Sequence, residues 1–203
     1  MKNIYLILIV LLSNTIKSQT IINITDSEMG LPNGYYAKDL DNLLDPFQGT
    51  YIYNNGNTSF KIVLTKMIMQ PVGSHFEDMI IGEYQYIENG IEKINTLSNL
   101  NVNYPNQFLK HNIASKYIIK NINSRLWKCP QCNSNEKRLA ADLEDKISGR
   151  SADFLMRRTI INGQEVMQVM IQHISSDPIV VGSSVPAQPE FSLPTDEFIM
   201  TKQ

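Results

Sequence analysis

The 203-residue chain carries 18 Lys and Arg against 20 Asp and Glu, and 42% of its residues are hydrophobic. Nucleic-acid binding normally needs a basic surface, and a formal charge of −2 without a basic cluster argues against it. The 10 Gly and 9 Pro are too few for a collagen-like or disordered chain. Length and hydrophobic content therefore predict one domain with a core of its own.

Residues 1–18 have the layout of a secretory signal peptide. Lys2 makes the start positive, and an unbroken apolar run covers residues 4–12. As a helix this run spans about 14 Å, roughly half the hydrocarbon core of a bilayer, so it is too short for a membrane anchor. Small and polar residues follow, and we place the cleavage after Ser18, which makes Gln19 the first mature residue. The sequence thus predicts export, to the periplasm or out of the cell, with no transmembrane span in the mature chain.

After residue 47 the chain alternates between β-rich runs and Asn-Gly pairs, which favour tight hairpin turns. Phe60, Ile62 and Leu64 alternate with polar residues, as on a half-buried strand. Single strands are also expected over residues 114–122 and 197–201. Three hairpins are expected: residues 49–53 with 58–69 around Asn55-Gly56, 78–87 with 91–97, and 153–161 with 164–174.

Residues 135–149 fit two structures. Leu139, Leu143 and Ile147 recur every four residues, as on one face of a helix, and Gly149 lies beyond the end. Their position among strands favours instead a strand over residues 137–144. We favour the strand, and the pattern itself leaves the helix open.

Eight or nine strands with short connections predict an all-β fold. An antiparallel up-and-down meander hides its edges best by closing into a barrel, and a barrel of this size can hold one small ligand. The expected organisation is a signal peptide over residues 1–18, an extended N-terminal segment over residues 19–47 and a β-barrel domain over residues 48–203.

Several motifs are distinctive. They are residues 30–39 (GLPNGYYAKD), residues 42–51 (NLLDPFQGTY), residues 78–84 (DMIIGEY) and Leu193-Pro194-Thr195. Together they resemble a family of small exported bacterial proteins that carries a domain of unknown function. Gly49-Thr50-Tyr51 is also similar to the G-x-W that opens lipocalin barrels, with Tyr in place of Trp. The resemblance covers most of the mature chain outside about residues 100–150. It implies a lipocalin-like β-barrel and transfers no catalytic residues.

Cys129 and Cys132 form a C-x-x-C motif in a polar loop. Such a motif serves as a redox dithiol, as half of a zinc site or as a local disulfide. The redox form needs a helix N-terminus at the first Cys, and zinc needs four ligands. His75, His111 and His173 have no ligand spacing. In an exported protein a local disulfide is the simplest outcome, and we expect no metal site and no cofactor.

Four tyrosines on the first two hairpins are the candidate ligand-binding residues: Tyr51, Tyr53, Tyr84 and Tyr86. Their rings and hydroxyls suit an apolar cavity with a few polar groups, and packing in the core is their alternative role. The chain has no G-x-S-x-G, H-E-x-x-H or phosphate-binding Gly loop. The leading hypothesis is therefore a non-enzymatic, lipocalin-like exported binder of a small apolar ligand or an envelope component.

Two alternatives remain. The first is a structural or interaction module with a filled core that binds a protein partner, in the envelope or outside. The second is an envelope thiol–disulfide protein that uses Cys129 and Cys132.

Overall fold

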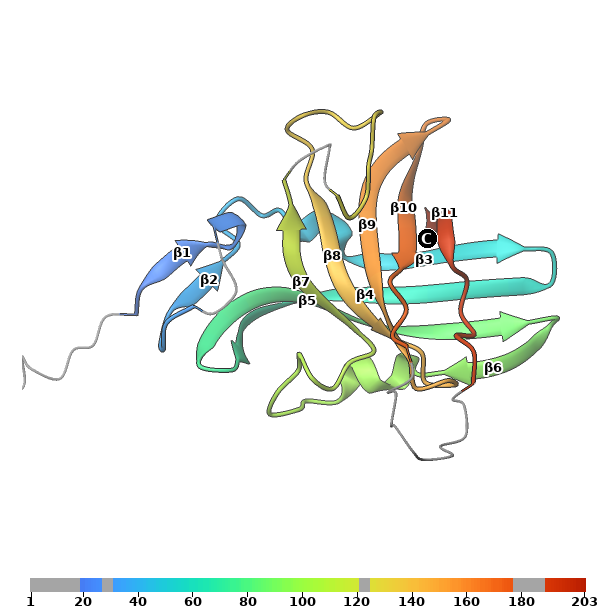
Figure 1. Ribbon diagram of the computed structural model, residues 1–203, viewed down its shortest axis with the longest axis horizontal. Helices are drawn as coiled ribbons and strands as arrows, with labels where there is room; N and C mark the ends of the chain where they lie inside the picture. The colour runs from blue at the N-terminus through green and yellow to red at the C-terminus, as the bar shows by residue number, and fades with distance from the viewer. Residues whose placement is uncertain (1–18, 27–30, 121–124, 177–188) are drawn as a thin grey trace, which may run out of the picture.

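The computed structural model describes residues 19–26, 31–120, 125–176 and 189–203, so the expected signal peptide and Ser18 lie outside the described residues. Within these ranges, eight antiparallel strands close into a barrel (Figure 1). Chain order is also the order around the barrel, and the last strand pairs with the first. The predicted up-and-down barrel is therefore confirmed. The strands are β3 (Gly49–Asn55), β4 (Thr58–Val72), β5 (His75–Glu88), β7 (Ile113–Ile119), β8 (Arg138–Glu144), β9 (Ser151–Ile161), β10 (Gln164–Gln172) and β11 (Asp196–Lys202).

The three predicted hairpins are present as β3–β4, β5–β6 (Ile91–Asn95) and β9–β10. One turn differs from its prediction. Asn55 pairs with Thr58, and in this turn only Gly56 has a positive φ, of 59°. The turn therefore consists of Gly56 and Asn57, because a two-residue turn with glycine first needs a positive φ at that position alone. The pattern located the hairpin correctly but misplaced its turn by one residue.

The ambiguous segment is a strand. β8 pairs with β7 on one side and with β9 on the other, so its backbone groups are bonded on both edges. Leu139, Ala141 and Leu143 point into the barrel and are buried. A helix here would have left two strand edges unpaired, and this outweighs the helical spacing of the leucines.

The N-terminal segment forms part of the core. It contains β1 (Ile21–Asn23), η1 (Ile24–Asp26), β2 (Tyr36–Lys38) and η2 (Asp45–Phe47), and β2 runs parallel to the start of β5. Leu44 and Phe47 are buried in the main core. A buried carboxylate, Asp78, accepts hydrogen bonds from the Tyr36 hydroxyl (2.6 Å) and from the backbone N–H groups of Asp39 and Met69 (2.9 Å each). These contacts tie the segment to β4 and β5.

Candidate functional site

The interior of the barrel is filled by side chains. Most of those that point inward are at most 2% exposed to a water-sized probe; they include Phe60, Ile62, Leu64, Ile80, Tyr84, Phe154, Met156, Met167, Val169 and Met200. A side chain that lined a water-sized cavity would show accessible surface toward it. These residues therefore pack against one another, at the density that protein cores normally reach.

Tyr51 and Tyr84 use their hydroxyls inside this packed structure. The Tyr51 hydroxyl donates to the carbonyl of Pro46 (3.2 Å), and the Tyr84 hydroxyl donates to the carbonyl of Glu144 (3.1 Å) and accepts from the N–H of Lys146 (2.9 Å). Burial raises the pKa of both phenols, so both stay neutral and able to donate. The Tyr51 hydroxyl thus binds η2, and the Tyr84 hydroxyl binds the end of β8 and the segment that follows it.

Tyr53 and Tyr86 belong to an aromatic cluster around Phe60. The rings of Tyr84, Tyr86 and Phe198 lie 5.6, 6.4 and 6.5 Å from that of Phe60. The Tyr53 ring lies 4.6 Å from Phe198, and both rings are only partly buried. Edge-to-face pairs at these distances stabilise a core by about 0.5–1.5 kcal/mol each. The structure thus brings three of the four candidate tyrosines together, and their ligand-binding role stays a prediction.

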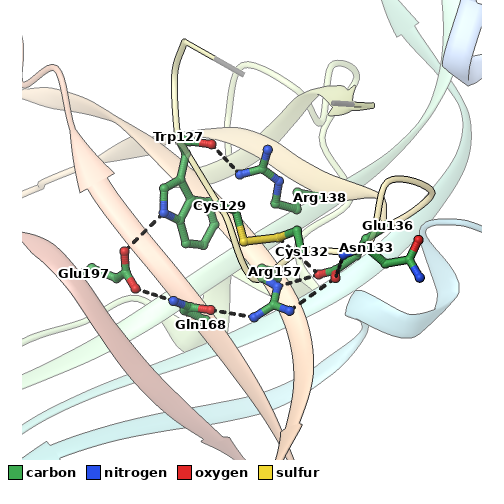
Figure 2. The surroundings of a disulfide bond; sticks show 9 residues. All are labelled: Trp127, Cys129, Cys132, Asn133, Glu136, Arg138, Arg157, Gln168 and Glu197. Carbon is green, nitrogen blue, oxygen red and sulfur yellow. Dashed lines mark hydrogen bonds and ion pairs between the residues drawn. A yellow bond between two sulfur atoms is a disulfide. The ribbon is translucent and has the colours of Figure 1, made fainter. Parts of the chain in front are cut away.

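Cys129 and Cys132 are joined by a disulfide in the loop between β7 and β8 (Figure 2). This loop folds over the outer surface of the barrel. Trp127 packs there in a second, smaller core with Ile119, Ala140 and Leu155. Cys129 is completely buried and Cys132 is 7% exposed. Burial of both cysteines restricts the access of an external thiolate to the disulfide.

A chain of polar side chains fastens this loop to three strands (Figure 2). The Trp127 indole N–H donates to Glu197 (3.2 Å), and Glu197 also accepts from the side-chain amide of Gln168. Arg157 donates to Gln168 (2.9 Å) and, through two nitrogens, to Glu136 (2.5 and 3.2 Å). Because the partners come from β9, β10, β11 and the loop, the chain fixes the loop on the barrel.

Arg138 completes this surface. Its guanidinium donates to the carbonyl of Trp127 (2.6 Å) and lies 5.3 Å from the centre of the Trp127 ring. Burial lowers the pKa of the guanidinium. The arrangement is that of a stacked cation over an indole, which stabilises the position of the ring.

The sequence was compared with families of known proteins, with curated proteins and with solved structures. The model of a family of unknown function, DUF6705, matches residues 1–203. The chain belongs to this family. Neither the curated proteins nor the solved structures gave a match. Membership in DUF6705 confirms the resemblance to a family with a domain of unknown function, whereas export and a bacterial source remain predictions.

This DUF6705 member also has a buried polar cluster that the sequence did not reveal. Glu83, on the outward face of β5, lies 2.9 Å from His111 Nδ1 and accepts from the Asn112 side chain (2.5 Å). His111 Nε2 lies 2.6 Å from the Gln107 side-chain oxygen. The loop after η3 (Leu97–Asn101) buries the whole cluster. Its partners lie up to 29 residues apart, so no short motif connects them.

Each of the remaining two histidines lies within hydrogen-bond distance of one carboxylate: His75 of Glu77 (2.7 Å) and His173 of Asp153 (2.8 Å). Among the described residues, no group of three or more His, Cys, Asp or Glu is placed to hold a metal ion. In the same part of the chain, no helix has the length and apolar character needed to span a bilayer.

Proposed function

We propose that this DUF6705 member is an exported interaction module, a rigid β-barrel with a filled core that binds a protein partner through its outer surface. The packed interior carries the proposal. A carrier of small apolar molecules needs a cavity of about 300–1,000 Å³ that buries most of its ligand. Among the described residues, the side chains in the middle of the barrel are at most 2% exposed, which supports a filled interior rather than such a cavity.

Export rests on the sequence of residues 1–18 and receives support from the disulfide. Disulfides persist in the periplasm and outside the cell and are rare in the cytosol. The bond between Cys129 and Cys132 lies within a loop that is fastened to the barrel, which supports a structural role rather than thiol–disulfide exchange. The proposed location is therefore the periplasm or the exterior of the cell.

Native mass spectrometry of the protein purified from its host's envelope fraction tests the function. A mass equal to the mature chain with one disulfide, and no added molecule, supports the module. A co-purifying lipid or other apolar molecule would overturn it and favour the small-ligand carrier. The same spectrum locates the mature N-terminus, which is expected at Gln19.

A second measurement uses benzene as a cavity probe. We expect benzene to leave the Tm of the wild-type protein unchanged, because the described side chains pack the interior of the barrel. Phe60→Ala is the matched control, since removing a buried ring leaves a cavity that benzene can fill and thereby stabilise. If Phe60→Ala does not fold, Ile62→Ala serves instead. A benzene-induced rise in Tm for the wild-type protein contradicts the filled core.

A further inference from the structure

The barrel closes at two short seams. β11 pairs with β3 at Tyr51 and Ile52, and β5 pairs with β7 at Ile81 and Gly82. Within the described ranges, the pairing of β3 with β11 ends at Ile52, and no residue of β3 beyond it pairs with β11. Each seam therefore leaves a stretch of strand edge that its barrel neighbour does not cover.

The fold covers the free edge of β5 with added strands. β2 pairs with β5 at Phe76 and Glu77, before the seam, and β6 pairs with it from Gln85 to Glu88, after the seam. At the β3–β11 seam, within the described ranges, no added strand pairs with β11 from Asp196 to Met200 on the side that faces β3. This stretch of β11 is bonded to β10 on its other side. Added strands therefore cover the edge of β5 on both sides of its seam, whereas β11 from Asp196 to Met200 has β10 as its one strand partner within the described ranges.

Strand geometry identifies the backbone groups that face the β3–β11 seam. The N–H of Gln203 donates to the carbonyl of Thr50 (2.9 Å), so residue 203 faces β3. Alternate residues of an antiparallel strand direct their backbone groups to the same neighbour, so Ile199 and Glu197 also face the seam. Phe198 and Met200 face β10. An open edge of this kind is complementary to another extended backbone.

Side chains at the seam provide apolar contacts for such a backbone. Tyr53 and Phe198 lie at the inner side, in contact with each other and only partly buried. Ile199 lies on the outer side and is 37% exposed. An extended segment along β11 would place alternate side chains against the aromatic pair and against Ile199. By contrast, the free edge of β6 is five residues long and carries Glu92 and Lys93, features that discourage pairing.

We propose that the β3–β11 seam binds an extended segment of a partner protein, which adds to β11 as a strand and has apolar side chains at alternate positions. This inference rests on the proposed interaction module and names its binding edge. Main-chain hydrogen bonds to Glu197 and Ile199 would hold the segment, and the Tyr53–Phe198 pair would select apolar residues.

Amide hydrogen exchange tests the seam in the free protein. The N–H groups of Glu197 and Ile199 should exchange much faster than those of Phe198 and Met200, which are bonded to β10. Equal protection of all four would overturn the proposal, because the edge would already be paired. That result would leave the interaction module itself intact, since native mass spectrometry tests the module separately.

A blocked peptide with the sequence of β3, residues 49–55, is the binding probe, because β3 is the strand that already pairs with β11. Addition of the peptide should slow exchange at Glu197 and Ile199 at least tenfold and leave unchanged Glu92, whose N–H faces the free edge of β6. N-methylation of alternate peptide amides distinguishes strand addition, which needs the peptide N–H groups, from nonspecific hydrophobic association, which does not. Only one of the two alternate methylation patterns should abolish binding. Equal loss of binding with both patterns overturns the proposal. So does an absence of exchange protection at Glu197 and Ile199 with about 1 mM unmethylated peptide.

A pair of variants at residue 199 provides a third readout. Ile199→Pro removes the N–H that faces the seam and leaves the bonds to β10 in place, so it should abolish peptide binding. Ile199→Val keeps the N–H and should bind within about threefold of the wild type. Unchanged peptide binding by a folded Ile199→Pro variant would contradict the proposal. If that variant does not fold, the binding of the methylated peptides tests the proposal instead.

Discussion

Gly82 lies where β5 pairs with β7 to close the barrel, opposite Ile113. A Cβ atom at this position would lie 2.5 Å from Leu64 Cδ2 and 3.0 Å from the carbonyl oxygen of Val63. We expect Gly82→Ala to lower the free energy of unfolding by about 1–3 kcal/mol through overpacking, measured by urea denaturation. In a double-mutant cycle, Leu64→Ala should relieve part of this cost. Strict additivity of the two losses would contradict the steric explanation.

Asp145 is a second residue whose surroundings affect stability, in this case as a function of pH. Burial alone would raise its pKa, but hydrogen bonds from Ser148, from Ser192 and from the N–H of Ile147 outweigh burial, and the pKa is lowered. A carboxylate with a lowered folded-state pKa stabilises the protein above its unfolded pKa of about 3.9, and this stability is lost as the pH falls through the folded pKa.

Asp145→Asn should therefore cost about 1.5–3 kcal/mol at pH 7, because hydrogen bonds to a charged acceptor are lost. The difference from the wild type should shrink below about pH 4, as the wild-type carboxylate takes up its proton. Denaturation midpoints between pH 2 and 7 measure this. A difference that stays constant down to the lowest pH would show that the charge of Asp145 contributes nothing.

At the scale of elements, the disulfide loop is a segment fastened to the outer surface of the barrel. Reduction of the Cys129–Cys132 bond, or the double change Cys129→Ser and Cys132→Ser, should lower the free energy of unfolding by about 2 kcal/mol, the chain-entropy expectation for a four-residue loop. Trp127 is the only tryptophan of the chain, so its emission reports on the loop directly. We expect a red shift as the indole becomes exposed to water.

Glu197→Gln is the matched control for this measurement. It weakens the hydrogen bond to the Trp127 indole and leaves the disulfide in place. A smaller red shift than that of the double Ser variant is expected. Reduction without any change in emission would show that the polar chain and the small outer core hold the loop unaided.

The elements also show where sequence patterns succeed. Period-two alternation placed Phe60, Ile62 and Leu64 inside the barrel correctly, because alternation is a local property of a pleated strand. Glu83 lies on the outward face of β5 and is nevertheless completely buried. A loop that begins more than ten residues later covers its side chain, and a local sequence pattern cannot predict burial by a distant segment.

At the scale of the whole molecule, closure joins the two ends of the chain. Thr201 pairs with Ile52, and Leu44 and Phe47 of the N-terminal segment belong to the same core as Met200. We expect one cooperative unfolding transition in urea, with the same midpoint by Trp127 emission and by far-UV circular dichroism. Refolding should take milliseconds to seconds, since the closing contacts are non-local.

Two separate midpoints would contradict this picture. An earlier Trp127 transition would mark the disulfide loop as a unit that opens before the barrel. Phe47→Ala distinguishes the two cases. If the N-terminal segment and the barrel share one core, it should lower the free energy of unfolding by about 3–5 kcal/mol and shift both urea midpoints down together.

The sequence by itself determined the β-class, the three hairpins, the inward faces of the strands and the cysteine pair. These depend on side-chain period, on turn dihedrals and on residues three apart, all of which are local. Only the tertiary structure decided that residues 138–144 are a strand, that the interior is filled, that Glu83 and Arg138 are buried, and that the β3–β11 seam lies open. Each of these depends on which distant segments come together, because backbone pairing and burial are settled by neighbours in space rather than along the chain.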